Sequence, residues 1–203
     1  GDPSIKMGEG WLSCIRYDNA AGKKAEIAAM QRDFGQERRF LDIEETRALA
    51  GSERYFQSAL DASAFHMHPL RYALMIAKKA AAAGAKIFED TAAVSVTKTG
   101  SGFAVRMAKG EITARYVVYC VSSLDRTLHR PTGRAILPVA TYVAVTEPLK
   151  QDAIRTRSAC SDSRRAGNYY RLIDQDRLLW GGAITTRISE PRRLAEVMKR
   201  DML

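Results

Sequence analysis

The chain has few cysteines, no long apolar run and no secretory signal. Its 203 residues include three cysteines, Cys14, Cys120 and Cys160, which are far apart and odd in number. This usage is typical of reduced thiols rather than of a disulfide framework. No apolar run approaches the roughly 18 residues of a membrane helix, and the N-terminal stretch lacks the pattern of a cationic segment followed by an apolar one. We therefore expect a cytoplasmic protein without a membrane span.

Short motifs that carry chemistry are also absent. The sequence contains no GxGxxG, Walker A, HExxH or GxSxG pattern, so its residues alone identify neither a nucleotide loop nor a catalyst. The net charge of +9, from 32 basic and 23 acidic residues, permits an anionic partner. The basic pairs are scattered and mixed with acids, whereas nucleic acid requires a basic patch or stripe. We expect no nucleic-acid partner.

Three local features have both a functional and a structural interpretation. His66 and His68 of "FHMHP" point the same way on an extended chain, but no further ligand stands at metal spacing, so we expect no metal site. The structural interpretation is that His68 caps the following helix and His66 lines a cleft. No base accompanies Cys120, which favours a core thiol over a nucleophile. The pair Gly181–Gly182 either admits a flat ligand or bends a strand.

The first third of the chain reads as a strand and two helices. Residues 10–17 alternate as a strand does. A helix over residues 20–34 is predicted by a cap at Asp18 or Asn19 and by Gly35 at its end. A shorter helix follows Asp42, with Glu45 as its capping-box partner and Gly51 as its terminator. We expect residues 52–67 to form a loop.

The middle of the chain reads as a helix followed by strands. Pro69 is suited to the first helical position and Gly84 to the end of the helix. A stripe of Leu70, Ala73, Leu74, Ala77 and Ala81 predicts a helix face packed on a sheet. Buried strands are expected at 85–89 and 112–121, with the strands 93–98 and 103–107 between them.

The last third of the chain is predicted to consist mainly of strands. Residues 136–149 alternate with period two, and residues 168–184 form a hairpin with its turn at Asp174–Asp176. A helix starts at 189–191, and its pattern is still open where the sequence stops. The expected fold class is α+β, with a mixed or antiparallel sheet, its helices and a piece of an α/β domain.

Four stretches taken together resemble one family. In chain order they are "HPLRYALMIAKKAAAAGAKIFEDTAAVSV", "GEITARYVVYCVSS", "LPVATYVAVTEPL" and "YYRLIDQDRLLWGG". They resemble the middle of D-amino-acid-oxidase-like FAD-dependent oxidoreductases, a family with glycine and sarcosine oxidases, and are nearest to its gamma-glutamylputrescine-oxidase-like members. The resemblance spans residues 10–185. It implies a middle fragment: substrate domain at 1–65 and 136–203, around a segment of a Rossmann-like FAD-binding domain at 66–135.

The resemblance also implies site residues. Val94 and the strand end Cys120, Val121 and Ser122 match positions near the adenine and pyrophosphate of FAD, although a cysteine at 120 departs from the small residues usual there. Tyr142, Tyr170 and Arg171 match substrate-domain strands that face the flavin, where Arg or Tyr suits a substrate carboxylate. The alternative is that Tyr170 packs the sheet and Arg171 is a surface charge. No catalytic residue is assigned.

The implied reaction is oxidation of the C–N bond of an amine or amino acid to an imine, with FAD as the hydride acceptor. We expect a small-molecule substrate. We expect this chain alone not to hold FAD tightly, because it offers the pyrophosphate no glycine-rich turn at a helix N-terminus. The alternative function is a non-catalytic small-molecule binding module of α+β fold.

Overall fold

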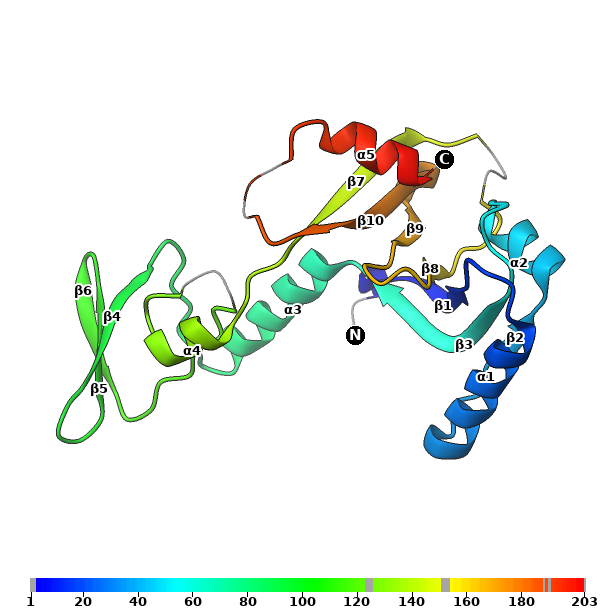
Figure 1. Cartoon of the computed structure of the whole chain (residues 1–203). Helices are drawn as coiled ribbons and strands as arrows, with labels where there is room; N and C mark the ends of the chain where they lie inside the picture. The colour runs from blue at the N-terminus through cyan, green and yellow to red at the C-terminus, as the bar shows by residue number, and fades with distance from the viewer. Residues whose placement is uncertain (1–2, 123–125, 151–153, 188, 190, 203) are drawn as a thin grey trace. The chain divides into compact units, whose positions relative to one another are not determined.

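The computed structural model (Figure 1) describes residues 3–122, 126–150, 154–187, 189 and 191–202. Its helices are α1 (Ala20–Phe34), α2 (Ile43–Ala50), α3 (Pro69–Ala82), α4 (Arg130–Ala135) and α5 (Leu194–Met202), with single 3-10 turns at Pro3–Ile5 and Asp174–Asp176. Its strands are β1 (Lys6–Cys14), β2 (Arg39–Leu41), β3 (Ser58–Met67), β4 (Ala93–Lys98), β5 (Phe103–Met107), β6 (Gly110–Ala114), β7 (Ala140–Pro148), β8 (Ala159–Ser161), β9 (Tyr169–Ile173) and β10 (Arg177–Thr185).

The chain folds into two compact units. One comprises Gly1–Ile76, Thr141–Ile184 and Ser189–Leu203, and the other comprises Ala77–Ala140 and Thr185–Ile188. The first unit is therefore discontinuous in sequence, and α3 begins in one unit and ends in the other.

The first unit is built on a mixed sheet of seven strands in the order β2-β3-β1-β8-β9-β10-β7. β1 pairs antiparallel with β3 on one side and parallel with β8 on the other. The parallel pair joins segments that are far apart in the sequence, with Leu12 opposite Cys160. A mixed sheet with helices confirms the predicted fold class.

Local capping explains where the first two helices begin and end. The Asn19 side chain accepts the backbone N–H of Gly22, and Gly35 ends the helix in the left-handed region at φ 64°. In α2, Asp42 and Glu45 form the reciprocal capping box, and Gly51 ends the helix at φ 67°. Glycine suits both ends because it has no Cβ to strain there. Both predicted helices are confirmed.

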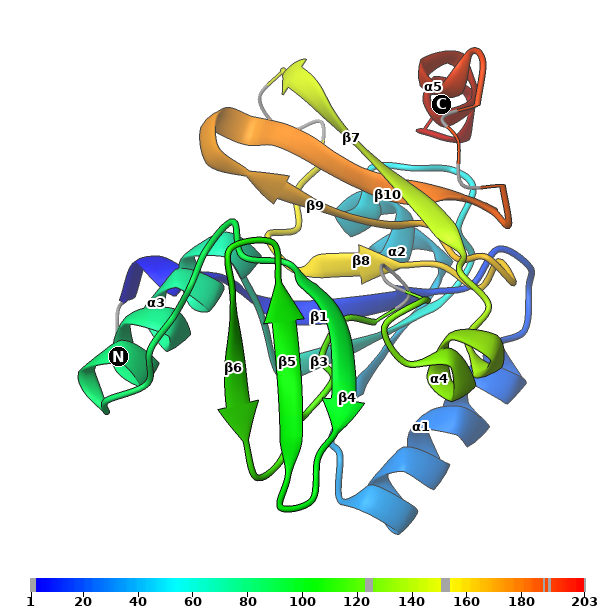
Figure 2. The same cartoon turned by 90° about the vertical axis from the view of Figure 1, so that its left-hand side faces the viewer.

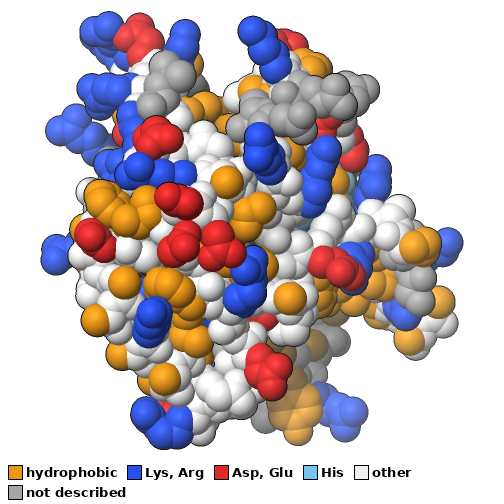
Figure 3. Space-filling model, turned by 90° about the vertical axis from the view of Figure 1, so that its right-hand side faces the viewer, with side chains coloured by type: hydrophobic (Ala, Val, Ile, Leu, Met, Phe, Trp, Pro, Cys, Tyr) orange, Lys and Arg blue, Asp and Glu red, His pale blue; other side chains and the backbone are white. Residues whose placement is uncertain are grey.

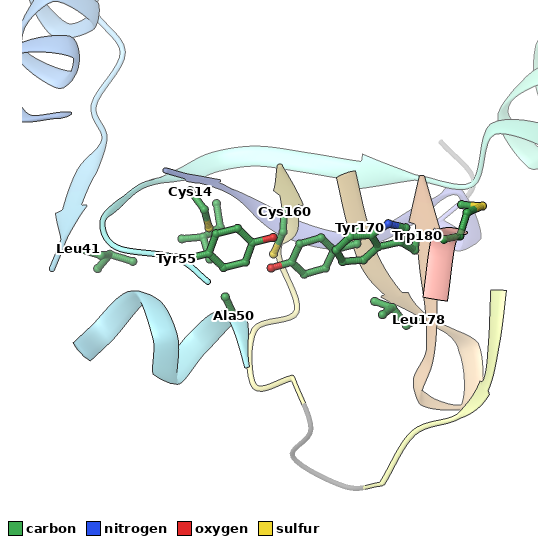
Figure 4. Packing of buried hydrophobic residues seen from close by; sticks show 10 residues of the cluster. Cys14, Leu41, Ala50, Tyr55, Cys160, Tyr170, Leu178 and Trp180 are labelled. Atoms are coloured by element: carbon green, nitrogen blue, oxygen red, sulfur yellow. The ribbon is translucent and has the colours of Figure 1, made fainter. Parts of the chain in front are cut away.

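The core of the first unit lies on one face of the sheet. It is formed by Leu12, Cys14, Leu41, Ala50, Tyr55, Cys160, Tyr170, Leu178, Trp180 and Met198. The Tyr170 ring stacks on Trp180, with centroids 4.8 Å apart, and on Tyr55 at 6.4 Å (Figure 4). Offset stacking of this kind adds to the burial energy of large rings. Burial raises the pKa of the Cys160 thiol to about 12.

The second unit contains an antiparallel three-stranded sheet, β4-β5-β6, whose strands lie side by side in Figure 2. Val96 faces Val105, and Ala104 faces Thr113. The predicted strands at 93–98 and 103–107 are confirmed, but a strand at 85–89 is wrong and the strand at 112–121 ends at Ala114. Apolar composition favours a strand only where another strand pairs with it. Residues 115–121 have no such partner in the described part of the chain, and Tyr116 is 82% exposed.

Two further predictions are wrong for related reasons. The α3 stripe was expected to pack on a sheet, but no described residue of α3 is buried, and Leu70 and Leu74 are exposed. The stretch expected as a loop contains β3, which pairs with β1 along its length. β3 is poor in β-branched residues, and register shifts interrupt the β1–β3 pairing, so the alternation that normally indicates a strand is hidden.

Candidate functional site

The face of the sheet opposite the core is open over β9, β10 and β7. Successive residues of a strand point to opposite faces, so Tyr170 and Leu172 of β9 are buried in the core while Tyr169 and Arg171 lie on the other face. Val143 and Val145 of β7 are half-exposed on this same open face. The open face combines apolar side chains with the partly buried cations Arg171 of β9 and Arg177 of β10.

Arg177 lies 3.9 Å from a carboxylate oxygen of Glu147, whereas Arg171 is hydrogen-bonded through one nitrogen only. Its Nη1 donates to the carbonyl oxygen of Met67 at 2.8 Å and to Nδ1 of His66 at 3.2 Å. Burial lowers the pKa of its guanidinium. Within the described part of the chain Arg171 has no carboxylate in ion-pair range, and its Nε and Nη2 make no hydrogen bond. A partly desolvated guanidinium with a free edge is suited to bidentate binding of a carboxylate.

His66 lies beneath Arg171 and is 8% exposed. Its Nε2 lies 3.0 Å from the carbonyl oxygen of Arg157. His68, two residues on, accepts the backbone N–H of Arg71 at 3.4 Å, which confirms that it caps α3. Among the described residues, no three His, Cys, Asp or Glu side chains are grouped so that they could hold a metal ion.

Tyr169 lies beside Arg171 on the open face and is 41% exposed. It pairs with Gly181 of β10, and a Cβ at Gly181 would overlap the Tyr169 ring. The ring therefore lies over the glycine, which accounts for a glycine at 181 by close packing. Sequence reasoning missed Tyr169. Its spacing of two residues from Arg171 is the signal that would have found it.

The two other predicted substrate residues lie elsewhere. Tyr170 is 3% exposed and its ring is enclosed by Tyr55 and Trp180. Tyr142 packs against the core from β7, and its hydroxyl donates to the carbonyl oxygen of Ser189 at 3.1 Å. The structure thus does not bring Tyr142 and Tyr170 together with Arg171. Tyr170 and Arg171 are both on β9, and Tyr142 is on β7 with β10 between the two strands. Both tyrosines lie on the core face, opposite Arg171.

The residues predicted to contact FAD all lie in the second unit. Val94 and Cys120 are exposed, Val121 is half-buried, and Ser122 is exposed with a φ of 51°. The expectation that Cys120 is a core thiol is wrong, because no described neighbouring element covers it. Contact of these four residues with the adenine of FAD stays a prediction.

The pyrophosphate of FAD needs a specific arrangement of backbone groups. It requires backbone N–H groups at a helix start that is reached through glycines. Among the described helices, α3 starts at Pro69, which has no N–H, and none begins with such a turn. The described helices therefore offer the pyrophosphate no start of this kind.

The surface charge on one face of the molecule shows no single patch of one sign (Figure 3). On the face drawn in Figure 3, Lys and Arg side chains are spread out with Asp and Glu side chains among them. No helix in the described part of the chain combines the length and apolar character needed to cross a bilayer.

Comparison with known proteins decides the family. The sequence profile described as "FAD dependent oxidoreductase" matches residues 7–200. The chain belongs to this FAD-dependent oxidoreductase family. FAD is the cofactor of the family, and the resemblance inferred from the sequence is confirmed.

Curated relatives support the assignment at the level of sequence. The chain is 28% identical over 181 residues to the probable oxidoreductase OrdL of Haemophilus influenzae, a match that covers 85% of this chain and 41% of the relative. It is 31% identical over 156 residues to the gamma-glutamylputrescine oxidoreductase of Escherichia coli, which covers 74% and 36%. The chain thus spans about two fifths of the length of the curated relatives it matches.

Solved structures confirm the fold. Glycine oxidase from Geobacillus kaustophilus matches with a TM-score of 0.73 at 18% identity, over 96% of this chain and 53% of that one. L-proline dehydrogenase from P. horikoshii matches with a TM-score of 0.74 at 15% identity, over 96% and 55%. At these identities the likeness shows the fold.

Proposed function

We propose that this chain supplies the substrate-binding sheet of an enzyme that oxidises the C–N bond of a carboxylate-bearing amine or an amino acid to an imine. The single observation that carries the proposal is the free Nε–Nη2 edge of Arg171, a partly buried cation on the open face of the sheet. Family membership supports the redox part, because FAD accepts the hydride from the carbon next to nitrogen. Gamma-glutamylputrescine, named in one relative, bears a carboxylate as well as an amine.

In this proposal the protein orients the substrate. The guanidinium of Arg171 binds the carboxylate through two parallel N–H donors, and the half-exposed Tyr169 beside it bounds the same site. The apolar side chains of Val143 and Val145 on β7 extend this face beyond β10. The first unit is then the substrate domain. The second belongs to the FAD domain, with Val94, Cys120, Val121 and Ser122 toward the adenine end.

The test uses the full-length oxidoreductase that contains this segment, with flavin reduction as the readout. The substrates are a panel of amino acids and the matching amino-acid amides, which lack the carboxylate charge. Arg171→Leu should lower kcat/KM for the preferred amino acid by about 10- to 150-fold, the loss of a charge-assisted hydrogen bond, and should change the amide much less. Arg165→Leu, at an exposed arginine before β9, is the matched control.

The outcomes separate the alternatives. Equal losses on acids and amides would remove Arg171 from carboxylate binding. Binding of the amino acids without any flavin reduction would instead favour a non-catalytic small-molecule binding module. A selective loss on acids, with the flavin absorbance spectrum unchanged, supports the proposal.

A further inference from the structure

We infer that His66 is a positioning residue for Arg171, held as the neutral tautomer that carries its proton on Nε2. This inference rests on the proposed role of Arg171 in carboxylate binding. It concerns a residue that never touches the substrate, because His66 acts through the guanidinium above it.

The two hydrogen bonds of His66 determine its tautomer. An arginine guanidinium can only donate, so Nδ1 of His66 must accept from Nη1 of Arg171 and carries no proton. A neutral imidazole then has its proton on Nε2, where the carbonyl oxygen of Arg157 accepts it at 3.0 Å. Each ring nitrogen has one partner of the required kind. The two partners thus fix the tautomer of the imidazole as well as its orientation.

The imidazole ring of His66 leaves no room for a side chain at Gly8. Gly8 of β1 pairs with His66 of β3, and a Cβ at Gly8 would clash with Nε2 of His66 and lie 3.0 Å from the carbonyl oxygen of Arg157. The φ of Gly8 lies outside the left-handed region, so its backbone admits other residues and the imbedded imidazole is what requires glycine. β1, β3 and the segment before β8 therefore enclose the imidazole together.

This enclosure determines which edge of Arg171 is free. Both anchors, His66 Nδ1 and the Met67 carbonyl oxygen, are bound by Nη1. Two anchors on one nitrogen fix the plane of the guanidinium and leave the Nε–Nη2 edge for a carboxylate. Without His66, the Arg171 side chain would keep only its hydrogen bond to the Met67 carbonyl oxygen and would be more mobile. Binding a carboxylate would then have to order this side chain, and that cost lowers the affinity.

A pair of substitutions separates the two hydrogen bonds of the ring. His66→Asn places an amide oxygen near the position of Nδ1 and so keeps an acceptor for Arg171. His66→Gln reaches toward Nε2 and keeps the Arg157 contact while leaving Arg171 without its acceptor. In the full-length oxidoreductase, His66→Gln should raise KM for the preferred amino acid by about 10-fold at nearly constant kcat, and His66→Asn should stay within about 3-fold of the wild type.

A third variant changes no polar group. Gly8→Ala should displace the imidazole and raise KM as His66→Gln does, while Gly100→Ala, where a Cβ meets open space, should not. If the His66 variants fold poorly, Gly8→Ala and the nitrogen spectrum of the unaltered protein still decide the question. In 15N NMR of the histidine-labelled protein at neutral pH, Nδ1 of His66 should resonate as an unprotonated nitrogen and Nε2 as a protonated one.

The outcomes distinguish this inference from the proposed function. A protonated Nδ1, or KM values for His66→Gln and His66→Asn that are equal to each other, would overturn the positioning role. If Arg171→Leu has no selective effect on acids, the proposed function fails by itself. If Arg171→Leu affects acids selectively but His66→Gln leaves KM unchanged, the positioning role of His66 is rejected and the proposed function stands.

Discussion

Replacing Tyr170 with phenylalanine tests whether this residue belongs to the core or to the substrate site. The change removes one oxygen and keeps the ring, which stacks on Trp180 and Tyr55. Figure 4 shows the hydroxyls of Tyr170 and Tyr55 turned toward one another. The Tyr170 hydroxyl is nevertheless buried without a hydrogen-bond partner of acceptable geometry in the described part of the chain.

The magnitude follows from that environment. A buried hydroxyl that makes a hydrogen bond typically contributes about 1 kcal/mol, whereas an unsatisfied one costs about 1–3 kcal/mol of desolvation. We therefore expect Tyr170→Phe to leave the free energy of unfolding unchanged or to raise it by up to about 1 kcal/mol. Tyr170→Ala, which removes the ring, should lower it by about 3–5 kcal/mol. Urea unfolding of the three proteins, followed by circular dichroism, gives these values.

A specific result would refute the reasoning. If Tyr170→Phe lowers the free energy of unfolding by more than about 1 kcal/mol at an unchanged denaturant slope, the hydroxyl makes a stabilising bond. In the full-length enzyme the same substitution should leave kcat/KM for amino acids unchanged. A large selective loss there would return Tyr170 to the substrate site.

Three further predictions concern Lys23 and two of the cysteines. Lys23→Met should lower the free energy of unfolding by about 1 kcal/mol in the same urea assay, because the buried Lys23 Nζ donates to Ser13 at 3.2 Å and to Glu26 at 3.1 Å; an equal loss in the exposed neighbour Lys24→Met would contradict this. Iodoacetamide at pH 8 should alkylate the exposed Cys120 and spare Cys160, whose pKa burial raises from 9.0 to about 12. The Cys160 thiol stays protonated to a higher pH in the folded state than in the unfolded state, so the free energy of unfolding should fall as the pH rises from 9 to 12. Alkylation of Cys160 in the folded protein at pH 8 would contradict its burial.

Some of the fold could be predicted because its causes lie within a few residues. The caps at Asn19, Asp42 and Gly51 act on backbone groups at most four positions away. The hairpin of β9 and β10 is likewise set by its turn at Asp174–Asp176. These predictions needed no knowledge of distant partners.

The remaining errors come from interactions between distant segments. Whether residues 85–89 form a strand, or the α3 stripe is buried, depends on what pairs with them or covers them, and the sequence does not state this. At the site, Arg171 was found by resemblance and its binding role stays a prediction. The alternation of side chains along a strand would have placed Arg171 and Tyr170 on opposite faces of the sheet. The contact between His66 and Arg171 depends on how distant strands are aligned, which no local sequence pattern shows.

The parallel pairing of β1 with β8 has a consequence for how the chain folds during synthesis. Trp11 donates to Ser161 at 2.9 Å across a separation of 150 residues. The strands made first thus keep an unpaired edge until β8 leaves the ribosome, after all of Ala77–Ala140 has been translated. Such long-range closure is slow and leaves strand edges open to other chains. Recombinant yield should therefore depend on chaperones and on slow translation more than the stability of the finished sheet would suggest.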